Sequence, residues 1–373
     1  MSDSGPNLEA LRNKIAEVDR SIAQAIGERL ELARSIGKWK RASREPTRDF
    51  GTEAQVLDRW RRDLAASGIA PDRAETLARW LIEESVRIQD EDRSVAPPPV
   101  AESADIAIVG GAGAMGAWLA EFFEDAGHPV AIVDPRASST GRLAIPEVEA
   151  AATQVDVLVF ATPIRSTAPL LRRALATDTR ALIFDVLSVK APVETILSAA
   201  ASAGRKVTSI HPMFGPSART LSGRNLLIVS CGSADADREA RSLFERSALS
   251  IAEVPLDRHD LLIAESLGLA HAVNLLFLAA LSADPASPHD LAQAASTTFH
   301  RQAALAAAVA SEGAELYLDI QALNPHSWGM YQELRAALDR LAGVVDRRDL
   351  PAFEKLLQSG KAKLEPGIGG MRA

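Results

Sequence analysis

A glycine-rich string in the middle of the chain has the spacing of a phosphate-binding loop. Gly111, Gly113 and Gly116 follow the apolar run 106–109 directly and precede a helical pattern. In such a loop the first glycine makes the tight turn, the second lets the backbone approach a pyrophosphate, and the third lets helix and strand pack closely. This arrangement predicts a dinucleotide-binding site.

Two neighbouring features refine that prediction. Ala114 and Met115 lie at the predicted start of the helix, where backbone amides can donate to phosphate oxygens. Asp134 ends the next apolar run, where a carboxylate can accept a hydrogen bond from a ribose hydroxyl and repel a 2′-phosphate. The site is therefore predicted to hold NAD, although Arg136 nearby leaves NADP open.

Polar strings follow the later predicted strands. Because ligand sites in open parallel sheets lie beyond the carboxyl ends of the strands, these strings are expected to line the cofactor side. Thr162, Pro163 and Lys190 are the residues expected to contribute to cofactor binding. The strings are Ala161–Ile164, Asp185–Lys190 and His211–Pro216.

The string His-Pro-Met-Phe-Gly-Pro at 211–216 is the most specific of these motifs. With it, the chain resembles prephenate dehydrogenases over residues 105 to about 350. The resemblance implies oxidative decarboxylation, in which hydride passes to the nicotinamide and a ring carboxylate leaves as CO₂. It implies that His211 accepts a hydrogen bond from the C4 hydroxyl and helps to remove its proton, a role for a group titrating near neutrality. It also implies that His271 is a second substrate-site residue.

One position departs from that family. The family usually has a carboxylate-binding arginine nine residues before the aromatic that precedes Asp-Ile, and here that position is Ala308. Arg301 lies about 10 Å earlier on roughly the same helical face, and His300 is adjacent to it. Because bidentate arginine–carboxylate contacts are strong, the substrate, the position of the arginine or the activity is expected to differ.

The N-terminal helical pattern carries cations and amides in a second set of matching strings. Ala10–Ile15, Glu28–Ala33, Ile36–Lys40, Thr47–Asp49 with Glu53, and Glu84–Gln89 resemble the all-helical chorismate mutases over residues 8 to about 92. That reaction rearranges a dianion without a cofactor, so the enzyme must hold a compact conformer and stabilise charge at the breaking ether bond.

The resemblance implies a role for each matching residue. Arg29 binds a carboxylate, and Arg12 reaches in from the partner subunit. Lys40 and Gln89 donate to the ether oxygen, Asp49 and Glu53 surround the C4 hydroxyl, and Ser85 supports a carboxylate. Thr52 departs from the pattern, because the family commonly has arginine at this position.

Three functions follow from these motifs. The first is a bifunctional enzyme that converts chorismate to prephenate and then, with NAD, to 4-hydroxyphenylpyruvate on the way to tyrosine. The second applies the same two reactions to 4-amino-4-deoxy analogues, and Thr52 motivates it, because losing a cation beside the acidic pair favours an ammonium. The third is an active mutase attached to a non-catalytic, NAD-binding module, which Ala308 motivates.

The elements that position these residues predict a multi-domain protein. Apolar residues at three- and four-residue steps predict one helix over 8–42, followed by helices at about 52–66 and 72–92. Alternating β-branched runs and helical segments then predict an α/β Rossmann domain, and Ala/Leu-rich segments predict a helical substrate and dimerisation domain. The expected boundaries are 1–93, a proline-rich linker at 94–103, 104–256 and 257–373.

The first helix also predicts the assembly. It would be a rod of about 50 Å, too long to bury its apolar stripe against two short partners. We therefore expect an intertwined helical homodimer.

Composition narrows the partners further. The 373 residues carry a net charge of −8, which disfavours nucleic acid and anionic membranes as partners and leaves small anionic substrates possible. Cys231 is the single cysteine, so no disulfide forms within the chain and a cytoplasmic location is expected. The sequence shows no signal peptide and no apolar run of about 18 residues, so no membrane span is expected. No metal site is predicted.

Overall fold

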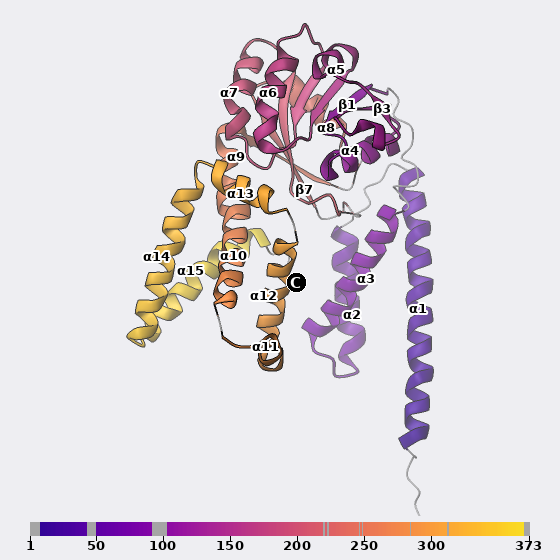
Figure 1. Ribbon diagram of the computed structural model, residues 1–373. Coiled ribbons are helices and arrows are strands. Elements are labelled where there is room, and N and C mark those ends of the chain that lie inside the picture. The colour runs from indigo at the N-terminus through magenta and orange to yellow at the C-terminus, as the bar shows by residue number, and fades with distance from the viewer. Residues whose placement is uncertain are drawn as a thin grey trace, which may run out of the picture. The chain divides into compact units, whose positions relative to one another are not determined.

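The computed structural model describes residues 8–42, 50–91, 103–218, 221, 224–245, 247, 249–283, 285–311 and 313–368 (Figure 1). The chain divides into two compact units. The first comprises Met1–Leu187 and Val193–Pro255, and the second comprises Ser188–Pro192 and Leu256–Ala373.

Three helices form the N-terminal part of the first unit. They are α1 (Leu8–Ala42), α2 (Phe50–Ala65) and α3 (Pro71–Glu91), close to the predicted ranges. α3 packs against both α1 and α2, and its fully buried Ala74 and Ala78 have side chains small enough for close approach. Gly68, with φ +71°, turns the chain between α2 and α3.

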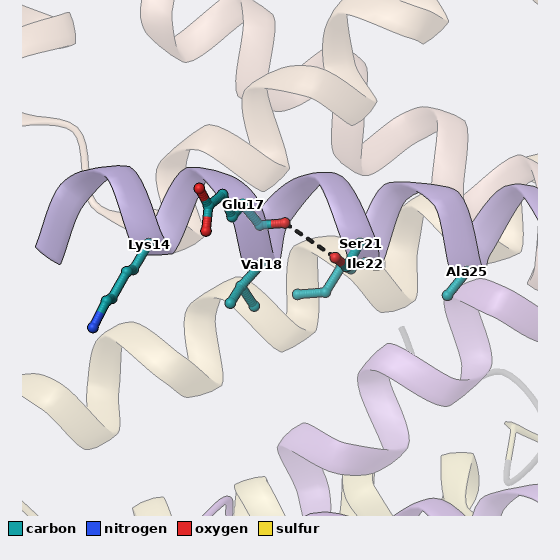
Figure 2. A pocket seen from close by; sticks show the side chains of 6 residues that line it. All are labelled: Lys14, Glu17, Val18, Ser21, Ile22 and Ala25. Carbon is teal, nitrogen blue, oxygen red and sulfur yellow. Dashed lines mark hydrogen bonds between the residues drawn. The ribbon is translucent and has the colours of Figure 1, made fainter. Parts of the chain in front are cut away.

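α1 leaves most of its apolar stripe uncovered within one chain. Leu11, Ile15, Val18 and Ile22 follow one another at steps of four, three and four residues, and each is between 42% and 61% exposed. Val18 and Ile22 project from the same side of α1 in Figure 2, where Ser21 donates to the Glu17 carbonyl one turn earlier. Such spacing is typical of a helix that packs lengthwise against another helix.

The rest of the first unit is built on an eight-stranded sheet with the order β3-β2-β1-β4-β5-β6-β7-β8. All neighbouring strands are parallel except β6 and β7. The strands are β1 (Ile106–Val109), β2 (Val130–Val133), β3 (Leu143–Ala144), β4 (Val157–Phe160), β5 (Leu182–Asp185), β6 (Val207–Pro212), β7 (Asn225–Ser230) and β8 (Ser250–Pro255).

Helices pack against this sheet and complete its core. α4 packs against β1 and β2, and α8 packs against β5, β6 and β7. Phe122 on α4 stacks on Phe244, which follows α8, with the ring centroids 5.3 Å apart. Cys231 is buried just after β7. The helices are α4 (Ala114–Asp125), η1 (Ala137–Ser139), α5 (Val148–Gln154), α6 (Ile164–Leu175), α7 (Ala191–Ser202) and α8 (Ala234–Ser242).

Within its described residues the second unit is helical, as the sequence predicts. Its elements are α9 (Leu256–Ile263), the π-helical segment η2 (Ala264–Gly268), α10 (Leu269–Ser282), α11 (Pro288–Ala294), α12 (Thr297–Ala310), α13 (Ala314–Leu323), α14 (Ser327–Asp346) and α15 (Leu350–Ile368). α10 packs against α12, and α14 packs against α15. α15 continues through Pro366 to Ile368, although the sequence around Pro366 predicts a loose tail.

One helical segment of this unit is more apolar than expected, because the sequence predicted no membrane span. By length and composition alone, the continuous helical segment Leu256–Ser282 is apolar enough to cross a membrane. It contains no uninterrupted apolar run of about 18 residues, because a few polar residues are spread along it. Core helices of water-soluble proteins have the same properties, so this is weak support for a membrane span.

Candidate functional sites

Arg29 forms the centre of a cationic site among the first three helices. From α1, its guanidinium donates to the Leu81 carbonyl at 2.7 Å and to the Ser85 Oγ at 2.6 Å, both on α3. The Ser85 hydroxyl in turn donates to the Leu81 carbonyl one helical turn earlier, at 2.7 Å. Burial, and then the positive charge of Arg59, lower the pKa of Arg29 below its ordinary value. The guanidinium is thus anchored by neutral groups, an environment that suits an added anion.

The other residues predicted for this site lie at different distances from Arg29 within one chain. Gln89 is 7% exposed and lies four residues after Ser85, on the same face of α3. Lys40 is partly buried near the end of α1. Arg12 is exposed and lies about 25 Å along α1 from Arg29, so it cannot join Arg29 within one chain. Asp49 and the Glu53 side chain lie outside the described residues.

The glycine string forms a turn between β1 and α4 that only small residues fit. Gly110 has φ +84°, and a Cβ there would lie 2.6 Å from the Ala161 carbonyl oxygen. A Cβ on Gly116 would lie 2.7 Å from the Gly111 Cα. Gly113 precedes α4 and provides no side-chain cap, and Ala114 and Met115 form its first turn. Sequence reasoning assigned roles to Gly111, Gly113 and Gly116 but not to Gly110, whose positive φ emerges only from the structure.

Asp134 lies at the end of β2 directly beside this turn. Its carboxylate accepts from the Ala112 amide at 3.2 Å and from the Arg136 amide at 2.8 Å, and its side chain is 6% exposed. The Arg136 guanidinium also approaches it, with Nε 3.4 Å from Oδ1. The carboxylate is therefore fixed next to the glycine turn, as the contact with a ribose would require.

The end of β4 completes the same edge of the sheet. β1 lies between β2 and β4, where the chain order reverses, and ligands bind at this point in open α/β sheets. Thr162 follows β4, and its Cγ2 would lie 2.9 Å from a Cβ on Gly110. The Thr162 hydroxyl pairs with the Thr167 hydroxyl at 2.7 Å, and Pro163 precedes α6. The residues present fit a dinucleotide, because glycines form the β1–α4 turn and the Asp134 carboxylate is held beside it.

His211 lies on β6, one strand beyond β5, and is 3% exposed. It stands opposite Leu227 in the antiparallel pair with β7. Two hydrogen bonds hold the string that follows. The Met213 amide donates to the Asn225 backbone carbonyl at 2.9 Å, and the Trp118 indole donates to the Ala218 backbone carbonyl at 3.0 Å. The histidine is therefore placed by the sheet rather than by a loop.

Lys190 is fully buried in the second unit. The amides of Lys190 and Ala191 both donate to the Asp260 carboxylate of α9 at 2.8 Å. His259 Nδ1 lies 2.7 Å from the same carboxylate. Burial alone would raise the pKa of Asp260, but these hydrogen bonds together lower it. Sequence reasoning did not assign a role to Asp260, which fixes the segment Ser188–Pro192 to the helical unit.

His271 lies on α10 in the second unit. Its ring meets Tyr317 edge-on, with centroids 4.3 Å apart, and its Nδ1 is buried without a hydrogen bond among the described residues. Burial lowers its pKa, because the imidazolium would lose hydration. A neutral ring with an unsatisfied nitrogen is suited to contact a polar substrate group.

Six residues before position 308, α12 makes a polar but uncharged contact with α10. Gln302, on α12, donates to the Asn274 Oδ1 on α10 at 2.9 Å. Asn274 lies three residues after His271, on the same side of an otherwise apolar helix. Arg301 and His300 are exposed. The sequence pointed to Arg301 as a possible replacement cation, and it did not single out the Asn274–Gln302 pair.

The chain matches two family descriptions in separate segments. Residues 11–90 match "Chorismate mutase type II", and residues 140–238 match "Prephenate dehydrogenase, nucleotide-binding domain". A T-protein from Haemophilus influenzae is 24% identical over 351 residues, which cover 93% of this chain and 89% of that protein.

A relative with higher identity covers a smaller part of the chain. The 4-amino-4-deoxyprephenate dehydrogenase of Streptomyces pristinaespiralis is 32% identical over 269 residues, which cover 67% of this chain and 87% of that protein. Among solved structures, the A. aeolicus prephenate dehydrogenase shares the fold with a TM-score of 0.58 at 16% identity, covering 71% of this chain and 99% of that one. That structure contains hydroxyphenyl propionate and NAD+.

Proposed function

The chain belongs to the prephenate dehydrogenase family, fused to a type II chorismate mutase domain, and from this premise we propose that it converts chorismate to prephenate and then oxidises prephenate to 4-hydroxyphenylpyruvate with NAD. It is thus an isomerase and an oxidoreductase in one chain. The proposal depends mainly on Arg29, a half-buried cation that, among the described residues, donates to neutral groups of α3 and is suited to bind an anion.

In the mutase site, the residues of α1 and α3 bind and orient the substrate. Arg29 and Ser85 hold one carboxylate, and Gln89 donates to the ether oxygen whose bond to carbon breaks. Gln89 is an amide, so its donor stays available at any pH. Lys40 is assigned to the same oxygen, and Asp49 and Glu53 to the C4 substituent. A second chain supplies Arg12, because the Arg12 of the same chain is too far along α1.

In the dehydrogenase site, the β1–α4 turn would hold the pyrophosphate and Asp134 the ribose of NAD, with Thr162 and Pro163 beside them. Bound NAD supplies a hydride acceptor. His211 accepts the proton of the C4 hydroxyl, and His271 contacts the substrate in its neutral form. Lys190 keeps the segment after β5 in place, because its backbone amide donates a hydrogen bond to the Asp260 carboxylate.

A second candidate substrate pair is the 4-amino-4-deoxy analogues of chorismate and prephenate. The relative that is 32% identical is a 4-amino-4-deoxyprephenate dehydrogenase. Thr52 stands where chorismate mutases commonly carry arginine, and an ammonium at C4 would be favoured by losing a nearby cation.

We also propose that the working enzyme is a cytoplasmic homodimer, with the boundaries 1–93, 94–103, 104–256 and 257–373. The uncovered stripe of α1 supports an intertwined pair of mutase domains. In the helical unit, Leu276, Trp328 and Leu338 are at least 53% exposed around an apolar groove between α10, α14 and α15. A second copy of the chain would cover this surface. Neither a membrane nor a nucleic acid is then needed to cover it.

The experiment that tests the function supplies purified protein and NAD with each substrate in turn. NADH formed from chorismate supports the first candidate. NADH formed from 4-amino-4-deoxychorismate but not from chorismate selects the second. NAD binding together with mutase activity but without NADH from either compound contradicts the dehydrogenase half.

A further inference from the structure

We propose that Gln321, on α13, is a positioning residue of the dehydrogenase site, which stabilises the π-helical segment η2 and thereby directs His271 toward the substrate. This role rests on the proposed dehydrogenase function and adds a residue to it. Sequence reasoning did not select Gln321, because a π-helical turn has no characteristic pattern in the sequence.

The segment η2 is a wide turn within the continuous helical segment Leu256–Ser282. The Leu269 amide donates to the Ala264 carbonyl five residues earlier, whereas an α-helix would join residues four apart. Turns of this kind are rare in proteins and occur often at functional sites. A wide turn in an otherwise regular helix therefore points to a contact that stabilises it.

α13 supplies this contact, because it packs against η2 (Figure 1). The Gln321 Nε2 donates to the carbonyl of Gly268, the last residue of η2, at 3.0 Å. The Tyr331 hydroxyl, on α14, donates to the Gln321 Oε1 at 3.1 Å. An amide oxygen only accepts hydrogen bonds, so its bond with Tyr331 fixes the amide with Nε2 toward Gly268.

The same face of α13 also contacts His271. One helical turn before Gln321, Tyr317 meets the His271 ring edge-on, with the ring centroids 4.3 Å apart. Residues four apart lie on one face of a helix, and both Tyr317 and Gln321 are partly buried, whereas the two sequence neighbours of Tyr317 are exposed. Because His271 follows Gly268 by three residues, α13 contacts both the end of η2 and the histidine after it.

The wide turn determines the direction in which His271 points. Each residue of an α-helix turns the chain by about 100°, so closing η2 into an ordinary turn would rotate the following side chains relative to α9 by an angle of this order. His271 would then leave the ring of Tyr317. Its buried Nδ1, which has no hydrogen bond among the described residues, would also point elsewhere. The bond from Gln321 to Gly268 therefore favours the direction of His271 that suits substrate binding.

The first test removes this bond in the full chain. Gln321→Met keeps the length of the side chain and loses both hydrogen bonds. The substrate is prephenate or its 4-amino analogue, whichever the unaltered chain oxidises with NAD. Its KM should rise about 2- to 10-fold, the range for one hydrogen bond, with a smaller change in kcat. NAD affinity and mutase activity should stay the same.

Gln293→Met is the matched control and should leave KM unchanged. Gln293 is an exposed glutamine of the same unit, and its side chain pairs with His289 on its own helix. Gln321→Glu, at neutral pH, keeps the acceptor for Tyr331 and loses the donor to Gly268, so it should behave like Gln321→Met. An unaltered KM in Gln321→Glu would contradict the role of the donor.

A double variant separates positioning of His271 from general support of the helices. Adding Gln321→Met to His271→Ala should raise KM no further, because Gln321 acts through the histidine. A glutamine that only stabilises the packing would raise KM in both backgrounds. Independent effects of the two substitutions would therefore overturn the proposal.

The imidazole resonances of His271 provide a readout that needs neither NAD nor substrate. They can be assigned by their absence from the spectrum of His271→Ala, and the ring of Tyr317 should shift them. Gln321→Met should move them toward their positions in Tyr317→Leu, whereas Gln293→Met should not move them. Unchanged His271 resonances in Gln321→Met would also overturn the proposal.

The proposed function fails by a different result. If the unaltered chain oxidises neither prephenate nor its 4-amino analogue, the dehydrogenase assignment is wrong, and the resonances still decide whether Gln321 directs His271. If His271→Ala impairs oxidation and Gln321→Met does not, the dehydrogenase assignment stands and only the role of Gln321 is rejected.

Discussion

At the scale of single residues, the mutase half depends on the positive charge of Arg29. Among the described residues, no acidic side chain forms an ion pair with it. Arg29 crosses from α1 to α3 and is held by a carbonyl and a hydroxyl. A guanidinium fixed in this way needs little reorganisation when an anion arrives, which is the condition for electrostatic catalysis.

Replacing Arg29 with Gln should lower the mutase kcat/KM about 100-fold or more, because a charged contact to a carboxylate is lost. Oxidation of prephenate should be unchanged. Arg34→Gln, which removes an exposed arginine paired with Glu31 on the same helix, is the control and should keep both activities. A similar loss in the two variants would remove Arg29 from the site.

His271 should make stability depend on pH. Its pKa in the folded chain lies below the ordinary value of 6.5, so the unfolded chain binds more protons as the pH falls through that value. The free energy of unfolding should therefore decrease as the pH is lowered through about 6.5. Buried His128 contributes in the same direction. Urea unfolding across this range should show a shallower decrease for His271→Gln, and an unchanged pH dependence would contradict the buried, neutral assignment.

At the scale of elements, the β1–α4 turn is the feature that the sequence defined best. The glycine spacing, with an apolar run before it and a helical pattern after it, predicted a tight turn between a strand and a helix, and the structure has this turn between β1 and α4. The carboxyl-end strings were likewise placed on the correct strands. These predictions succeeded because a glycine turn and buried parallel strands impose strict local patterns.

Other elements could not be predicted because their signals are weak or non-local. β3 has two exposed residues, and β8 shows no apolar alternation, so neither has the pattern of a buried strand. The attachment of Ser188–Pro192 to the helical unit depends on Asp260, which is distant in sequence. The contact of Arg29 with Leu81 and Ser85 also depends on the packing of α1 against α3, which spacing within one helix does not reveal.

Gly116→Ala should weaken NAD binding and destabilise the first unit by about 1–3 kcal/mol. The reason is that the new Cβ would overlap the backbone of Gly110 and Gly111. Gly329→Ala is the control, since a Cβ there meets nothing within 4 Å. NAD titration and thermal unfolding measure the two effects. Equal NAD affinity in both variants would show that the turn does not bind the dinucleotide.

At the scale of the whole molecule, the uncovered stripe of α1 and the distance of Arg12 from Arg29 lead to the same expectation. We expect the mutase site to be complete only when a second chain lies along the first. Dimer formation and mutase activity should therefore be lost together.

Replacing Val18 and Ile22 with Glu should dissociate the mutase pair, because a dimer would have to bury two carboxylates without partners. Sedimentation should show a smaller species or a more concentration-dependent mass, and mutase activity should fall in parallel. Ala23→Glu, on a different face of α1, should change neither. An active mutase that remains monomeric would refute the shared site.

We propose that two separate sites act in sequence and that only the second transfers electrons. Supplying His211→Asn with NAD and whichever of the two chorismate compounds the unaltered chain oxidises tests this most directly. We expect the rearranged product to accumulate at the unaltered rate while no NADH forms. A parallel loss of rearrangement and NADH formation, or continued NADH formation, would contradict it.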